Sequence, residues 1–261
     1  MRKYLKFASA VAMLFVIGST AVMAADKAFN CEKAYPAHLQ GFDCTDEYIF
    51  WSFSNMLVKT DWQGRELAAV PVKYHHGDLC FYNDKIYVAV NYGKFNDSDG
   101  KADNYVLVYS AGDLKLLETY PVPEVTHGAG AIARTENGFL VTGGLPSLPE
   151  KFPANLIYEY DENFKFIRSY QAFPWTLNGV QTICSFRGGW LLGCHRGRLI
   201  FFDGEFKFIV DEPLDSTHGI MVKPETGKLW RAFSSRNSEG LWQARVFPVN
   251  DRSFVLPVKK K

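Results

Sequence analysis

The stretch Tyr74-His75-His76-Gly77-Asp78-Leu79-Cys80 decides how the chain is organised, because shortened copies of it recur along the sequence. Each copy places a polar residue directly before a glycine and a short apolar run after it. We call these polar residues the markers; they are Gln40, His76, His127, Asn178 and His218. Self-similarity with a period of tens of residues is typical of solenoids and propellers. The markers therefore indicate a repeat architecture.

The spacing of the markers favours one such architecture. Their glycines are separated by 36, 51, 51 and 40 residues, and the chain ends 42 residues after the last one. Propeller blades are about 40–45 residues long, with the variation placed in loops. Each repeat fits four short strands, rich in aromatic and β-branched residues and bounded by Gly, Asn and Asp, and no amphipathic helix is evident. We predict an all-β fold: a five-bladed β-propeller with four antiparallel strands per blade and repeats starting near residues 40, 76, 127, 178 and 218.

The two ends of the chain leave the closure of the ring open. Phe254–Val258 fits the fourth strand of the last repeat. Ala25–Ala37 is too short for a sixth blade, so we expect it to supply one closing strand or to pack below the disc. A six-bladed ring, and a sandwich or barrel with accidental spacing, are the alternatives.

The first residues are typical of a secretory signal peptide. Three basic residues precede a mostly apolar run, Phe7–Val22, and small residues at Val22-Met23-Ala24 allow cleavage. The run is shorter than the roughly 20 residues that a membrane span needs. We therefore predict a signal peptide over residues 1–24, a single propeller domain over 25–261, export to the periplasm or the medium, and no stable membrane insertion after cleavage.

Charge and cysteine content narrow the partners. Removing residues 1–24 takes away three positive charges, which moves the net charge from +1 to −2. A near-neutral chain without a basic block argues against nucleic acid, and we expect a monomer that binds a small molecule or carbohydrate. Export permits disulfides, but an odd number of cysteines leaves at least one thiol free or paired between chains. The sequence does not determine the pairing among Cys31, Cys44, Cys80, Cys184 and Cys194.

The markers are the main candidates for a functional site. The strand after each marker is the innermost of its blade, so we expect the five side chains to converge on one axis. Three neutral imidazoles with a carboxamide or water suit a divalent transition metal, and catalytic zinc often has three protein ligands. The predicted metal ligands are His76, His127, His218 and Gln40, with the identity of the metal unknown. A hydrogen-bonded structural ring is an equally weighted interpretation, and metal-free ligand binding or catalysis by the same histidines is a third.

Further residues around the predicted mouth suit binding or proton transfer. Asp78 and His75 are candidates for the catalytic proton transfer, although a strand-entry turn and a loop cap explain them as well. The long segments 91–104 and 143–155 are expected to wall the mouth, since loops of that length are often functional. Cationic side chains clamp carboxylates and phosphates, but each alone is more often solvated. The predicted substrate-binding residues are Asn178, Lys94, His195, Arg196 and Arg236.

Known propeller families resemble the chain only in part. The ligand set is similar in type to that of oligogalacturonate lyases, which hold a metal with three histidines and a glutamine but have more blades. Five-bladed glycosidases are similar in blade number, but their chemistry needs paired carboxylates, and Asp43 and Asp78 are not at equivalent repeat positions. Plant-type glutaminyl cyclases are similar in size, export and blade number, without a shared motif.

The function that we predict from these observations follows from the axial histidines. It is that of a metal-dependent lyase or hydrolase for a small polar or acidic carbohydrate. The alternative is a non-catalytic glycan- or protein-binding propeller whose axial histidines are structural.

Overall fold

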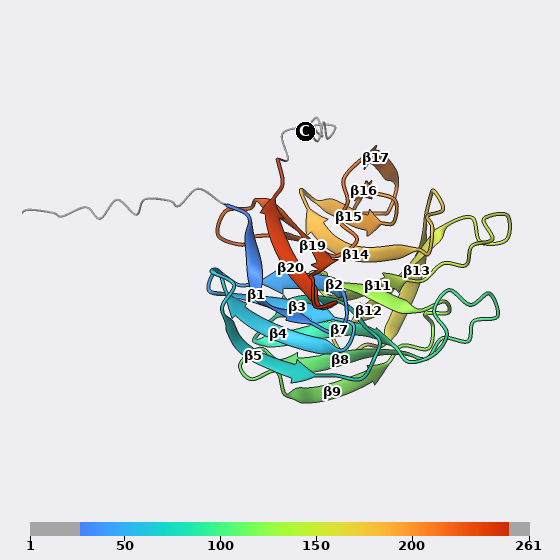
Figure 1. Cartoon of the computed structure of the whole chain (residues 1–261). Helices are drawn as coiled ribbons and strands as arrows, with labels where there is room; N and C mark the ends of the chain where they lie inside the picture. The colour runs from blue at the N-terminus through green and yellow to red at the C-terminus, as the bar shows by residue number, and fades with distance from the viewer. Residues whose placement is uncertain (1–26, 251–261) are drawn as a thin grey trace, which may run out of the picture.

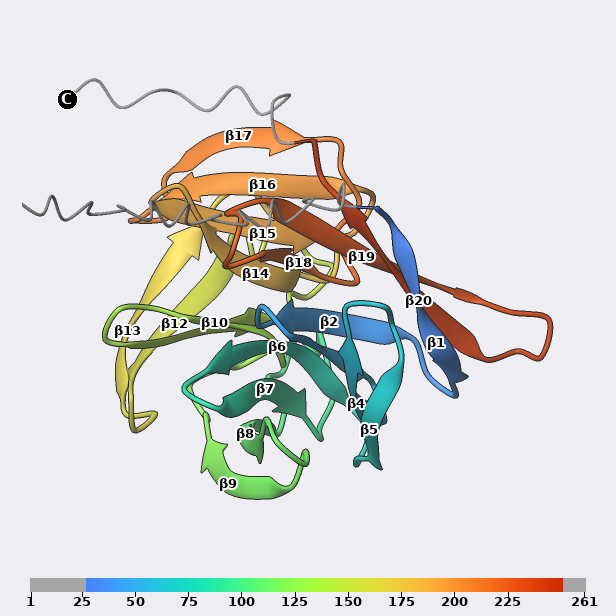
Figure 2. The same cartoon turned by 90° about the vertical axis from the view of Figure 1, so that its left-hand side faces the viewer.

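The computed structural model of the chain describes residues 27–250 (Figure 1). This part contains twenty strands and no helix, and the strands form five four-stranded antiparallel sheets set around a central axis (Figures 1 and 2). The predicted five-bladed propeller is thus confirmed. Within the same residues, nothing matches a helix long and apolar enough to cross a membrane. The predicted signal peptide lies outside the described residues.

Four blades each take their strands from one continuous stretch of chain. The first blade contains β2 (Leu39–Cys44), β3 (Tyr48–Phe53), β4 (Met56–Asp61) and β5 (Glu66–Pro71). The second contains β6 (His76–Tyr82), β7 (Lys85–Asn91), β8 (Asn104–Ser110) and β9 (Leu116–Pro121). The third contains β10 (Ala129–Arg134), β11 (Gly138–Gly143), β12 (Asn155–Asp161) and β13 (Phe166–Ala172). The fourth contains β14 (Val180–Phe186), β15 (Gly189–Cys194), β16 (Arg198–Asp203) and β17 (Phe208–Glu212).

The fifth blade joins the two ends of the chain. Its inner strands are β18 (Ile220–Val222), β19 (Leu229–Arg236) and β20 (Trp242–Pro248), and its outermost strand is β1 (Phe29–Tyr35). β1 pairs antiparallel with β20, with Phe29 opposite Val246 and Tyr35 opposite Trp242, so the blue and red strands lie side by side in Figure 2. Of the two expectations for Ala25–Ala37, a closing strand or packing below the disc, the closing strand is confirmed by Phe29–Tyr35. The predicted strand Phe254–Val258 lies outside the described residues.

A recurring turn links the third and fourth strands of three blades. In each, an aspartate carboxylate accepts backbone N–H groups two and four residues further on, at 2.9–3.0 Å, from Asp61, Asp161 or Asp203. In two of these turns, Phe164 and Phe206 adopt positive φ values of 57° and 61°. Their rings pack into the blade interface, and the Phe164 ring stacks on Phe139 with centroids 4.7 Å apart. A positive φ is unfavourable for a residue other than glycine. Burial of the two aromatic rings offsets that cost.

The five innermost strands β2, β6, β10, β14 and β18 contact one another in sequence around the axis. We call the end of the axis where they begin the upper end, and the opposite end the lower end. Large side chains, among them Trp51, Trp230, Tyr160 and Phe202, are fully buried between the blades. All five cysteines are free thiols. The packed blades therefore hold in place the residues at the two ends of the axis.

Candidate functional site

A pocket of about 350 Å³ lies at the upper end of the axis. Residues from four of the five blades or their connections line it, and the described part of the lining contains imidazole, carboxamide and aromatic groups but no charged side chain. The lining residues are His38, Gln40, Tyr74, His75, Asn91, Tyr92, Gly93, Phe95, Asn96, Gly130, Asn178, Gln181 and His195. Two markers, Gln40 and Asn178, therefore lie where they were expected.

The marker His76 is held inside the second blade. Its side chain is fully buried; Nδ1 lies 2.7 Å from the carbonyl oxygen of Lys73, and Nε2 lies 2.7 Å from the hydroxyl of Tyr109. A carbonyl oxygen only accepts, so Nδ1 carries the ring proton and Nε2 accepts from the tyrosine. Both nitrogens of His76 are thus engaged within the protein.

The marker His127 fastens a loop to the ring. Its Nδ1 donates to the carbonyl oxygen of Asp97 at 2.9 Å, and its own carbonyl oxygen accepts from the N–H of Asn96 at 2.8 Å. The loop then carries Phe95 over the axis, so closely that a Cβ atom on Gly128 (φ 122°) would stand 2.3 Å from the Phe95 ring. His127 therefore positions the segment 91–104, which walls the pocket as expected.

The second long segment, 143–155, adds no residue to the described lining of the pocket. It is tied to the first segment, because the side-chain oxygen of Asn96 accepts the N–H of Leu145 at 2.9 Å. Its contribution is therefore to support the wall rather than to form it.

The imidazoles of His38, His75, His195 and His218 lie near one another. Two of them, His38 and His75, contact Gln40 directly. The Gln40 side-chain nitrogen lies 2.8 Å from Nε2 of His38 and 3.0 Å from Nε2 of His75. The ring of His218 lies 6.1 Å from that of His38, and Nδ1 of His218 accepts the N–H of Ser234. The sequence reasoning missed His38, which lies just before β2 and two residues before Gln40.

The side-chain nitrogen of Gln40 carries two protons but has three possible hydrogen-bond partners around it. Besides the two imidazoles, the hydroxyl oxygen of Ser54 lies 2.9 Å from this nitrogen. A carboxamide nitrogen donates two hydrogen bonds, so it cannot satisfy all three neighbours at once. In addition, Nδ1 of His75 is buried without a partner in the described residues. Polar groups beside the pocket are therefore left unsatisfied by the described residues.

Burial keeps these imidazoles uncharged near neutral pH. It lowers the pKa of His75 and of His218 to about 4, and the neighbouring His38 imidazole adds to both shifts. Burial also lowers the pKa of His38 and of His195 below the usual 6.5. Neutral imidazole both donates and accepts a hydrogen bond, so the cluster can bind or relay a proton without adding charge.

The other predicted residues lie in different places. His195 lines the pocket, whereas Lys94, Arg196 and Arg236 are exposed and lie outside its lining. Asp78 also lies outside it, at the centre of the axis. Its carboxyl accepts the N–H of Ile183 at 3.2 Å, and burial raises its pKa well above the usual range.

The predicted metal ligands are not assembled as one group. His76 points into its blade and His127 toward its loop, and within residues 27–250 no three His, Cys, Asp or Glu side chains are arranged to hold a metal ion. Metal binding itself stays a prediction.

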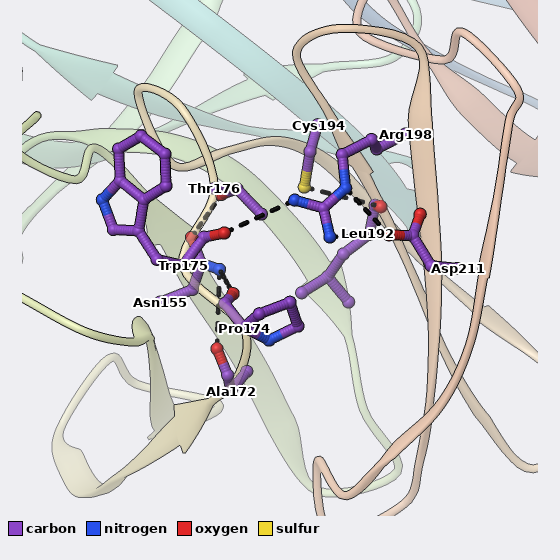
Figure 3. Close-up of polar contacts among 9 residues, drawn as sticks. All are labelled: Asn155, Ala172, Pro174, Trp175, Thr176, Leu192, Cys194, Arg198 and Asp211. Carbon is purple, nitrogen blue, oxygen red and sulfur yellow. Dashed lines mark hydrogen bonds and ion pairs between the residues drawn. The ribbon is translucent and has the colours of Figure 1, made fainter. Parts of the chain in front are cut away.

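Side chains from two blades hold the connection that precedes Asn178 in the chain (Figure 3). Asn155, at the start of β12, donates to the carbonyl oxygen of Pro174 at 3.0 Å and accepts the hydroxyl of Thr176 at 2.8 Å. From the next blade, Arg198 donates to the carbonyl oxygen of Trp175 and pairs with Asp211. These contacts fix residues 172–178 and thereby the entry into β14.

Comparisons with known proteins place the fold. Neither the protein-family models nor the curated proteins gave a match. Among solved structures, the chain is similar to the glutaminyl cyclase of Myxococcus xanthus, with a TM-score of 0.57 and 11% identity over 85% of this chain and 97% of that one. BamB from Moraxella catarrhalis (TM-score 0.42, 7% identity, 83% of this chain and 61% of that one) and the designed protein Ika4 (0.40, 12%, 66% and 94%) also match. The first likeness supports the propeller fold and no more.

Proposed function

We propose that the upper pocket binds a small uncharged ligand bearing amide or hydroxyl groups, and that the protein is a ligand-binding propeller. The observation that carries this proposal is the lining, which combines carboxamides, neutral imidazoles and aromatic rings without a charged side chain in its described part. Carboxamides and neutral imidazoles donate and accept hydrogen bonds, and aromatic rings cover the apolar faces of a ligand. This proposal is a narrower form of the non-catalytic binding function that the sequence left open as an alternative.

An acidic ligand suits the pocket less well. A buried carboxylate needs a cationic partner, and the three predicted cations, Lys94, Arg196 and Arg236, lie outside the lining. The metal-dependent form of the prediction would require His76 to give up its bond to Tyr109. Elemental analysis of the wild type beside a His76→Ala/His127→Ala variant tests it: a metal present in the first and lost in the second would favour the metalloenzyme.

A second proposal is amide chemistry of the kind that the name glutaminyl cyclase describes. The fold likeness covers nearly that whole enzyme, and the pocket holds His75 as a neutral base. In such a reaction the amine nitrogen of an N-terminal glutamine attacks its side-chain carbonyl, the amine loses a proton, and the leaving amide nitrogen gains one as ammonia. With its pKa lowered to about 4, the His75 imidazole is a weak base that would take the amine proton only as the new bond forms and would return it readily to the leaving nitrogen.

The two proposals are separated by one set of measurements. Binding of neutral saccharides and of glutaminyl peptides is measured by calorimetry, and ammonia release is measured with the same peptides. His75→Ala alters the pocket, and Arg236→Ala serves as a control outside it. Neutral-ligand binding that only His75→Ala weakens supports the first proposal, and ammonia release lost in the same variant supports the second. Preference for acidic ligands that depends on Arg236 would overturn both.

A further inference from the structure

A second cavity, of about 240 Å³, lies at the lower end of the axis and is rich in sulfur. Cys44, Cys80, Cys184 and Met221 all line it, and they come from four different innermost strands, β2, β6, β14 and β18. The Cys44 thiol sulfur lies 3.5 Å from the Met221 thioether sulfur. The lower cavity therefore offers soft ligands, in contrast to the nitrogen and oxygen groups of the upper pocket.

The sulfur groups are shielded from solvent. Cys44 and Met221 are each 2% exposed, and Cys80 is 7% exposed. Asp43 also lines the cavity, and its carboxyl is held by the N–H groups of Cys44 and Phe81 at 2.8 and 2.7 Å. A metal ion is bound by the thiolate, so binding a metal here must displace a thiol proton.

We propose that Cys44 and Met221 bind a soft monovalent cation of the Cu(I) type. Thiolate and thioether sulfur select such ions over harder ones. On binding, the Cys44 S–H releases its proton to solvent and forms the sulfur–metal bond, while Met221 donates a lone pair; nothing is oxidised or reduced. One positive charge replaces another, so the buried site gains no net charge, whereas a divalent ion would add one at a cost.

The geometry needs an adjustment of about 1 Å. With metal–sulfur bonds of about 2.3 Å, a near-linear two-sulfur site separates the sulfurs by about 4.6 Å. The present separation is 3.5 Å, and the adjacent cavity gives Met221 room to move. Methionine is unbranched and adapts readily. The site that we propose is therefore the thiolate–thioether pair of Cys44 and Met221.

The test is an anaerobic titration of the full chain with Cu(I) against a competing chelator. Met221→Leu keeps the apolar volume and removes the sulfur, and Cys44→Ser removes the thiol. Cys31→Ser and Cys194→Ser are the controls, because those buried cysteines lie outside the lower cavity. Circular dichroism confirms that each variant folds.

We expect stoichiometric binding by the wild type and by both controls. Met221→Leu should weaken the affinity by about tenfold or more, which is at least the loss seen when groups behind a metal ligand are removed. Wild-type affinity in both Met221→Leu and Cys44→Ser would overturn the proposal, as would failure of the wild type to compete with the chelator. Should Cys44→Ser not fold, Met221→Leu alone decides. The result does not depend on the upper pocket.

Discussion

Replacing Tyr109 by phenylalanine tests whether His76 is structural. The Tyr109 hydroxyl lies 2.7 Å from Nε2 of His76, and Nδ1 of the same ring donates to Lys73. The tyrosine is 5% exposed and the histidine 0%. Removing the hydroxyl leaves a buried nitrogen acceptor without the donor that it has now. Such an unpaired group costs about 1–3 kcal/mol.

The assay is urea unfolding followed by tryptophan fluorescence, together with a thermal melt. We expect the free energy of unfolding to fall by about 1–3 kcal/mol with an unchanged m-value. At about 2–4 °C per kcal/mol for a domain of this size, the melting temperature should fall by roughly 2–12 °C. Tyr82→Phe is the matched control, because it makes the same chemical change at a residue that is 39% exposed.

The reasoning is refuted if Tyr109→Phe is as stable as Tyr82→Phe to within about 0.5 kcal/mol, the usual range of a surface substitution. Nε2 of His76 would then be free to serve as a ligand. That outcome would return weight to the metal site predicted from the markers.

Two further predictions concern ring closure and charge. Gly64→Ala should destabilise the protein by about 1–3 kcal/mol, because the added Cβ would stand 2.1 Å from the carbonyl oxygen of Asn30 in β1. Gly227→Ala is the control and should cost less, because Gly227 has a similar φ but open space around it. Equal losses of stability in denaturant melts would exclude a special role for the β1 contact. The pKa of His75 lies near 4, below the 6.5 of an unfolded chain, so its contribution to stability is complete above pH 6.5 and is lost as the pH falls toward 4. An NMR titration should give a midpoint near pH 4, and a midpoint near 6.5 would contradict the burial argument.

The fold could be predicted because each blade repeats the same local chemistry. The second strand of the first blade, Tyr48–Phe53, is an uninterrupted run rich in aromatic and β-branched residues, a pattern that predicts a strand. The choice of the closing strand was harder, because strand-like segments stand at both ends of the chain. Pairing of β1 with β20 decides it, and pairing between residues more than two hundred positions apart leaves no local signal in the sequence.

The site was predicted less well because equivalent positions in the repeats do not point the same way. The pairing of the innermost strands with their neighbours is irregular just after the markers, between Leu39 and Gly41 in β2 and between His76 and Leu79 in β6. Successive residues of a strand face opposite sides, and a bulge changes which side a residue faces. Gln40 therefore faces the pocket, whereas His76 faces its blade and His75 takes the place at the pocket.

The two ends of the axis carry different chemistry. Where the innermost strands begin, the side chains offer nitrogen and oxygen groups, and where they end, cysteine and methionine side chains offer sulfur. Between them stands Asp78, whose carboxyl crosses the axis to the N–H of Ile183 and lies so close to β2 that a Cβ on Gly41 would stand 1.8 Å from it. Burial raises its pKa, and the carboxyl fills the axis between the upper pocket and the lower cavity. The upper pocket and the lower cavity should therefore respond independently. Met221→Leu should leave ligand binding at His75 unchanged, and a change of more than about twofold would show that Asp78 couples the ends rather than separating them.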